Sequence, residues 1–134
     1  MKDLKNKVAI VTGSSSGVGA ATARQLAALG CHVVINYNSN SAGGDAVAAD
    51  CEKVGVEALV FKANVANDGD CRAMANAAIE KWGRIDVLVN NAGTTKFVDH
   101  NNLEGLNADD FQNIYGVNVI GAYQMTRAVA EQMK

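Results

Sequence analysis

Glycine and serine residues at a fixed spacing follow the first apolar run of the chain. Gly13, Gly17 and Gly19 form a G-x-x-x-G-x-G pattern, and the positions between them hold Ser14, Ser15, Ser16 and Val18. Glycine lets a backbone turn tightly and approach a ligand closely, and a helix start offers unpaired N–H groups to a phosphate. A plain structural turn is the alternative, since the spacing differs from the commoner G-x-G-x-x-G. The position between a strand and a helix favours a dinucleotide-binding turn.

A second small and polar turn occurs at Asn90-Asn91-Ala92-Gly93, directly after another apolar run. It also offers a route by which a backbone could approach a ligand closely. Either turn alone is a weak signal, whereas two of them at one edge of a sheet would be far more specific.

The elements that must position these turns are apolar runs alternating with amphipathic stretches. Residues 8–11, 31–37, 56–65 and 85–89 are typical of strands buried on both faces. A helix that ends at Gly30 follows the first turn. Ser41 could cap a second helix that buries Val47, Cys51 and Val54, and Asn67 could cap a third. The third helix has an apolar stripe formed by Cys71, Met74, Ala75, Ala78 and Trp82.

This alternation predicts an α/β fold with a doubly wound parallel sheet, helices on both faces and strand order 3-2-1-4. In that order the ligand crevice opens at the carboxyl ends of strands 1 and 4, which are the ends that both turns leave.

A polar loop at residues 94–107 leads to a last helix, which Asn107 would cap. Its apolar stripe consists of Phe111, Ile114, Tyr115, Ala122, Met125 and Val129. Asn118 falls on the same face, where an unpaired amide would be costly. Two hypotheses remain open for Asn118: a core asparagine satisfied by a backbone group, or a polar group directed into the crevice.

Composition limits the class of protein. The 134 residues are 49% hydrophobic and 19% charged, which fits one globular domain with one core. A net charge of −2 provides no field that would attract nucleic acid or an anionic membrane. No apolar run reaches membrane-spanning length, and Lys2, Asp3 and Lys5 lead directly into the first strand, so we expect no leader.

The three cysteines, Cys31, Cys51 and Cys71, form no C-x-x-C pair. This favours a reducing compartment, predicts a cytoplasmic protein, and suggests thiols that pack as small hydrophobic groups. With only two histidines in the chain, we expect no metal site.

Three motifs in this order resemble the short-chain dehydrogenase/reductase family, most closely its 3-oxoacyl-(acyl carrier protein) reductase-type members. They are T-G-x-x-x-G-x-G at residues 12–19, N-N-A-G at residues 90–93, and Asn118 within G-V-N-V-I-G. The resemblance covers the whole chain. It implies a Rossmann-fold oxidoreductase that transfers hydride between a nicotinamide cofactor and a small carbonyl or alcohol substrate.

The resemblance also shows what this sequence lacks. Family members continue through further strands that carry a catalytic Ser and a Tyr-x-x-x-Lys pair, and this sequence contains no Tyr-x-x-x-Lys. We therefore expect residues 1–134 to be the N-terminal, cofactor-binding portion of such an enzyme, inactive alone and prone to homo-oligomerisation, because the last helix commonly forms the family's subunit interface. The alternative is a non-catalytic nucleotide-binding or interaction fragment.

The resemblance implies roles for individual residues. Gly13, Gly17 and Gly19 would shape the cofactor loop, and Ser14, Ser15 and Val18 would contact the ribose and pyrophosphate. Asn64 and Val65 would lie against the adenine, where members usually carry Asp-Val. Asn91 would brace the central strands, Ala92 and Gly93 would lie along the ribose, and Asn118 would hold a water of the proton relay.

The choice of nicotinamide cofactor depends on the end of the second strand. An NAD site usually places a carboxylate there, roughly 20 residues past the glycines, and this chain has Tyr37. The absence of a carboxylate favours NADP(H), although Ser16 stands where some members carry an arginine for the 2′-phosphate. Asn38, Ser39 and Ser41 could bind that phosphate as neutral donors, and NAD(H) is the alternative.

Overall fold

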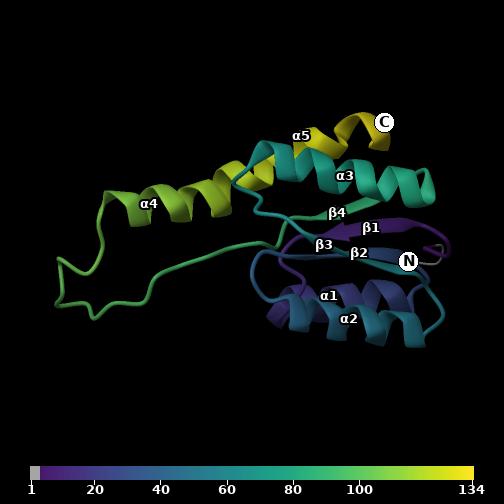
Figure 1. The fold of residues 1–134 in the computed structure, drawn as a ribbon, viewed down its shortest axis with the longest axis horizontal. Helices are drawn as coiled ribbons and strands as arrows, with labels where there is room; N and C mark the ends of the chain where they lie inside the picture. The colour runs from purple at the N-terminus through teal and green to yellow at the C-terminus, as the bar shows by residue number, and fades with distance from the viewer. Residues whose placement is uncertain (1–3) are drawn as a thin grey trace.

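The fold is a four-stranded parallel sheet with helices on both faces (Figure 1). A computed structural model describes residues 4–134; Lys2 and Asp3, which bear on the expected lack of a leader, lie outside the described residues. The strands are β1 (Val8–Val11), β2 (His32–Tyr37), β3 (Ala58–Lys62) and β4 (Val87–Val89). Their order is β3-β2-β1-β4, which confirms the predicted doubly wound arrangement.

The two faces of the sheet are covered by different pairs of helices (Figure 1). Side chains of a strand alternate between faces, so Ala9 and Val11 of β1 pack toward α1 (Gly17–Ala28) and α2 (Ser41–Lys53). Val8 and Ile10 pack toward α3 (Asp68–Trp82) and α5 (Gly121–Met133). All four residues of β1 are fully buried, as its continuous apolar run predicted.

Asparagine side chains determine where three of the helices begin. Asn40, Asn67 and Asn107 accept a backbone N–H of the first turn of α2, α3 and α4 (Ala108–Tyr115), respectively. The prediction that Ser41 caps the second helix was therefore wrong. Asn40 is the cap, because its Oδ1 accepts the N–H of Gly43 at 3.0 Å, and Ser41 is the first helical residue.

Several predicted boundaries were too generous. β3 is residues 58–62 rather than 56–65, β4 is 87–89 rather than 85–89, and β2 begins at 32 rather than 31. Each strand lasts only as long as its neighbour offers backbone groups to pair with, and β3 pairs with β2 alone. Val54 was expected in the core but is 57% exposed, because α2 ends at Lys53.

The last predicted helix is divided into three parts. α4 is followed by a π-helical turn, η1 (Gly116–Ile120), and then by α5. Only α5 lies over the sheet beside α3, whereas α4 and the loop before it extend away from the body (Figure 1); we call residues 94–115 the arm. The apolar stripe was therefore wrong at its start, since Phe111 and Tyr115 are exposed, and right at Met125 and Val129, which are buried. None of the helices in residues 4–134 has the length and apolar character needed to cross a membrane.

We predict that the 134-residue chain self-associates. β4 is an edge strand of the described sheet, and an apolar edge promotes pairing between molecules. In addition, α4 exposes Phe111 and Tyr115 by 62% and 57%, and α5 exposes Tyr123 by 60%. Light scattering at micromolar concentration should give more than the monomer mass. Tyr115→Lys should reduce association, whereas Leu29→Lys, on the opposite face, should not; a cooperatively melting wild-type monomer would contradict the prediction.

Candidate functional site

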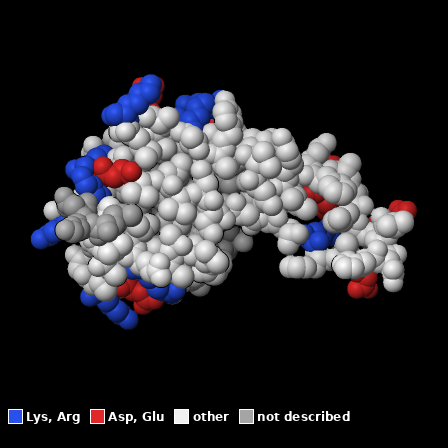
Figure 2. Space-filling view, turned by 180° about the vertical axis from the view of Figure 1, so that it is seen from behind, with Lys and Arg blue, Asp and Glu red and all other residues white. Residues whose placement is uncertain are grey.

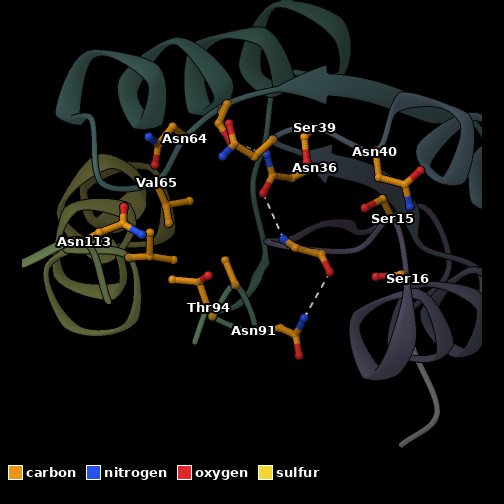
Figure 3. Close-up of a pocket in the computed structure, with 16 residues that line it drawn as sticks. Ser15, Ser16, Asn36, Ser39, Asn40, Asn64, Val65, Asn91, Thr94 and Asn113 are labelled. Carbon is orange, nitrogen blue, oxygen red and sulfur yellow. Dashed lines mark hydrogen bonds between the residues drawn. The ribbon is translucent and has the colours of Figure 1, made fainter. Parts of the chain in front are cut away.

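A groove of about 420 Å³ opens at the carboxyl edge of the sheet, between the turns that follow β1 and β4 (Figure 3). Its lining includes most of the residues singled out from the sequence: Gly13, Ser15, Ser16, Asn38, Ser39, Asn64, Val65, Asn91, Ala92 and Gly93. Six lining residues were not singled out, namely Asn36, Asn40, Ala63, Thr94, Asn113 and Val117. The expected Ser14, Gly17, Val18, Gly19 and Tyr37 are not part of the lining.

Gly13 is the point at which the two turns meet. Its N–H donates to Asn36 Oδ1 at 2.9 Å, and its carbonyl accepts from Asn91 Nδ2 at 3.1 Å (Figure 3). Its φ of +62° lies in the left-handed region, and an added Cβ would lie 2.9 Å from Ala92 Cα. No other residue type fits this position without strain.

The Thr12 hydroxyl also joins the two turns, from the end of β1. Thr12 is 1% exposed, and its Oγ1 accepts the N–H groups of Asn91 and Ala92 at 3.0 and 2.9 Å. The hydroxyl proton is then directed at Val89 O, at 3.4 Å. The turn after β4 is therefore fixed to the turn after β1 by side-chain as well as backbone bonds.

The first turn of α1, unlike those of α2, α3 and α4, has no side-chain cap. Ser16 precedes the helix but makes no side-chain cap hydrogen bond. The first N–H groups of α1 are therefore not satisfied by a cap, as those of α2, α3 and α4 are, and the start of a helix favours an anion. Gly19 places this start close to the turns, because an added Cβ would collide with the Asn91 amide and the Gly13 carbonyl.

Ser14 has a different role from the expected one. It is fully buried, its hydroxyl donates to Val11 O at 2.7 Å, and its Oγ accepts the N–H of Asn36 at 2.9 Å. Its own N–H donates to Asn36 O at 3.0 Å. Both donor groups of Ser14 thus hold the glycine turn against β1 and β2, and Ser14 supports the groove from behind rather than lining it.

Asn36 is a buried hydrogen-bonding centre that the sequence did not reveal. It is 2% exposed, and its Oδ1 accepts from Gly13 while its Nδ2 donates to Ala63 O at 3.2 Å and Phe61 O at 3.3 Å. It therefore connects the glycine turn with the segment leaving β3. The sequence did carry one signal: Asn36 directly follows the apolar residues of β2 and still lies within that buried strand.

Asn64 and Val65 form one wall of the groove after β3. The N–H of Asn64 donates to Asp70 Oδ2 at 2.9 Å, and its Oδ1 accepts from Ala66 N at 3.0 Å. Val65 is 4% exposed, and within residues 4–134 its N–H has no hydrogen-bond partner. A nearly buried donor without a partner, on a residue that lines a groove, is a candidate ligand contact.

Helix α5 holds this wall in place. Gln124 Nε2 donates to Val65 O at 2.7 Å, and Cys71 Sγ lies 3.2 Å from the same oxygen. Burial raises the pKa of Cys71 to about 11, so the sulfur keeps its proton and donates it. Gly121 brings α5 close, since an added Cβ would lie 2.5 Å from Val65 Cγ2.

Asn118 lies in η1 and is exposed rather than part of the core stripe. Its Oδ1 accepts from Thr94 N at 2.7 Å and its Nδ2 donates to Thr94 O at 3.0 Å. A backbone group thus satisfies the amide, and the bond ties η1 to the residue after the N-N-A-G turn. Asn118 also borders a separate cavity of about 20 Å³, which is large enough for one water molecule.

No charged side chain is among the residues that line the groove. On the face shown in Figure 2, Lys, Arg, Asp and Glu gather toward the two ends of the molecule, and the surface between them carries few. An ion cluster between α3 and α5 is not part of the groove lining: hydrogen bonds from Arg72 and Arg127 hold the pKa of Asp68 below its ordinary value. The groove must therefore recognise a ligand by backbone N–H groups, amides and hydroxyls.

These features fit a long ligand that carries phosphate. The glycine turn and the uncapped α1 start could accept a phosphate. Val65 lies on the other side of the groove from Ser15 and Ser16 (Figure 3), and its N–H, which has no partner within residues 4–134, could donate to another polar group. The site thus crosses the strand ends in the way that dinucleotide crevices of doubly wound sheets do.

Known proteins match the chain in sequence. A model of the short chain dehydrogenase family matches residues 7–134. An uncharacterized oxidoreductase of Methylorubrum extorquens is 39% identical over 133 residues, 99% of this chain and 52% of that protein. A 3-oxoacyl-(acyl-carrier-protein) reductase of Synechocystis is 41% identical over 133 residues, 99% of this chain and 53% of that protein. The chain spans about half the length of these curated relatives.

Solved structures share the fold. A short chain dehydrogenase from Burkholderia cenocepacia, crystallised in complex with NADP, gives a TM-score of 0.90 at 35% identity, over 97% of this chain and 52% of that one. A mutant short-chain dehydrogenase/reductase of Serratia marcescens gives 0.89 at 32% identity, over 98% and 52%. Because the family model covers nearly all of its residues, the chain belongs to the short-chain dehydrogenase family.

Proposed function

We propose that the groove binds NADP(H) and that the protein is an oxidoreductase acting on a small carbonyl or alcohol substrate. The observation that carries this proposal is the pair of interlocked turns at the uncapped start of α1. The residues fit such a cofactor. The two turns approach closely at Gly13 and Ala92, which forms a cradle that a Cβ on Gly13 would fill, and the Val65 N–H remains a free donor within residues 4–134. When bound, the nicotinamide supplies or accepts the hydride.

The residues of this chain would bind the cofactor and orient it in the groove. Ser15, Ser16 and the first N–H groups of α1 would hold the pyrophosphate, and Ala92 and Gly93 would lie along the ribose. Asn64 and Val65 would contact the base. Asn118 would hold a water of the proton relay beside Gly93, where a Cβ would lie 3.4 Å from its Oδ1.

Proton transfer to the substrate needs a group that this sequence does not contain. The sequence has no Tyr-x-x-x-Lys, and a positioned general acid commonly contributes about 10²–10⁴-fold to rate. We therefore propose that the 134-residue chain binds cofactor without turnover. A chain that catalyses reduction unaided would show that another side chain serves as the acid.

The end of β2 supports NADP(H) over NAD(H). Asn38, Ser39 and Asn40 line the groove there as exposed neutral donors, and no carboxylate is present to repel a 2′-phosphate. The structure of the Burkholderia cenocepacia relative was solved in complex with NADP.

Titration of NADPH and NADH, followed by cofactor fluorescence, tests the proposal. We expect NADPH to bind about tenfold more tightly. Tyr37→Asp should reverse this order, because a carboxylate accepts from the ribose 2′-hydroxyl and repels a phosphate. Tyr115→Asp, on the arm, is the matched control and should leave the ratio unchanged. Tighter binding of NADH by the wild type would overturn the NADP assignment, and binding of neither would overturn the proposed function.

A further inference from the structure

The orientation of the Asn64 amide is fixed by its own turn. Ala66 N–H donates to Asn64 Oδ1 at 3.0 Å. A flipped amide would place its NH₂ group against that N–H, so the hydrogen-bond network settles which atom is oxygen. Within residues 4–134, Nδ2 makes no hydrogen bond. The group that Asn64 has left for a ligand is therefore a donor.

The backbone that carries this amide is held at both ends. Asn64 N–H donates to Asp70 Oδ2 at 2.9 Å, and Asp70 N–H in turn donates to Asn67 Oδ1 at 3.0 Å. Val65 O accepts the short bond from Gln124. The unpartnered Val65 N–H and the Asn64 NH₂ are thus two donors on consecutive residues of a fixed wall.

The two donors, the Val65 N–H and the Asn64 NH₂, do not distinguish the edge of adenine from that of hypoxanthine. Adenine offers a donor at its 6-amino group beside an acceptor at N1, whereas hypoxanthine offers an acceptor at O6 beside a donor at N1. If Val65 N–H faces N1 and Asn64 faces position 6, adenine is matched at N1 only and hypoxanthine at O6 only. A carboxylate at residue 64 would be different, since it matches adenine at both positions and hypoxanthine at neither.

We propose that Asn64 makes base recognition in this groove permissive, so that dinucleotides of adenine and of hypoxanthine bind with similar affinity. The inference rests on the proposed function, because it assumes that the base of a nicotinamide dinucleotide lies against Asn64 and Val65.

The test compares NADPH with its deamino analogue, in which hypoxanthine replaces adenine. For the wild-type chain we expect the two dissociation constants to agree within about threefold, since each base loses one hydrogen bond. Asn64→Asp keeps an oxygen for Ala66 N–H, so the turn should be preserved. It should favour NADPH by about tenfold or more, because the carboxylate accepts from the 6-amino group and repels O6.

Asn38→Asp is the matched control, since it makes the same chemical change elsewhere in the groove. It should weaken both dinucleotides alike and leave their ratio unchanged. A wild-type preference for NADPH well above tenfold, or an unchanged ratio in Asn64→Asp, would overturn the inference while leaving cofactor binding intact. The wild-type ratio needs no variant, so it decides the matter even if Asn64→Asp fails to fold. Binding of neither dinucleotide would instead overturn the proposed function, and the inference with it.

Discussion

Replacing Gly19 with alanine should lower the affinity for NADPH by at least about 100-fold. An alanine Cβ would collide with the Asn91 amide and the Gly13 carbonyl, which are themselves hydrogen-bonded to each other at 3.1 Å. Backbone and a bonded amide cannot move aside cheaply, so either the turn shifts or α1 tilts away from it. Both outcomes misplace the N–H groups proposed to hold the pyrophosphate, and a loss of about 100-fold corresponds to about 2.7 kcal/mol.

The control for this variant is Gly116→Ala, which is also a glycine within a helical run. Its Cβ would lie 3.5 Å from Ala66 Cβ, an ordinary contact, so binding should be nearly unchanged. Isothermal titration and thermal melting of both variants would separate loss of binding from loss of folding. A folded Gly19→Ala variant that binds NADPH normally would refute the assignment of the glycine turn.

Asn36→Leu should destabilise the protein by about 3 kcal/mol and also abolish tight cofactor binding. The leucine is of similar size but leaves Gly13 N–H and Ala63 O without the partners they have at 2.9 and 3.2 Å. A buried polar group left without a partner costs about 1–3 kcal/mol, and here two are orphaned together. The glycine turn would also lose its connection to the segment after β3, so the groove would lose its shape.

Urea unfolding measures the loss of stability, and Asn38→Ala provides the comparison. Asn38 is exposed, two residues beyond Asn36, so its replacement should change the free energy of unfolding by less than about 0.5 kcal/mol. Equal stability of Asn36→Leu and the wild type would mean that the turn is held by other contacts.

The strand order could be predicted from the sequence because its signals are local. Each central strand is a short apolar run ended by a turn, and the alternation with helices leaves few topologies. The ends of the strands could not be predicted, because pairing with a neighbour determines them. Asn40 and Ser41 illustrate the same limit: both can cap a helix, and only the approach of Gly43 decides between them.

The candidate site was predictable only in part, for a similar reason. The residues of the two turns are contiguous in sequence, so their spacing indicated them. Asn36, Thr94 and Asn113 reach the groove from three separate segments. Asn36 follows an apolar run and Thr94 follows the N-N-A-G turn, but nothing in the neighbours of Asn113 marks it as a groove residue. The loop at residues 94–107 and the Asn107 cap were predicted correctly. The extension of α4 away from the sheet and the π-helical turn were missed, since a helical apolar pattern continues through residues 111–129 whether or not a sheet lies beneath it.

The hydrogen bond by which Gln124 of α5 holds Val65 has a thermodynamic consequence. β3 and β4 lie at opposite edges of the sheet, yet α5 contacts the exits of both, through Gln124 on Val65 and through Thr126, whose Oγ1 accepts from Asn90 Nδ2 at 3.2 Å. Docking of this C-terminal helix and closure of the groove are therefore linked equilibria. A change that frays α5 should therefore lower the population of the state that binds a ligand. Conversely, a ligand that fills the groove should slow amide exchange along α5, although α5 contributes no residue to the groove lining.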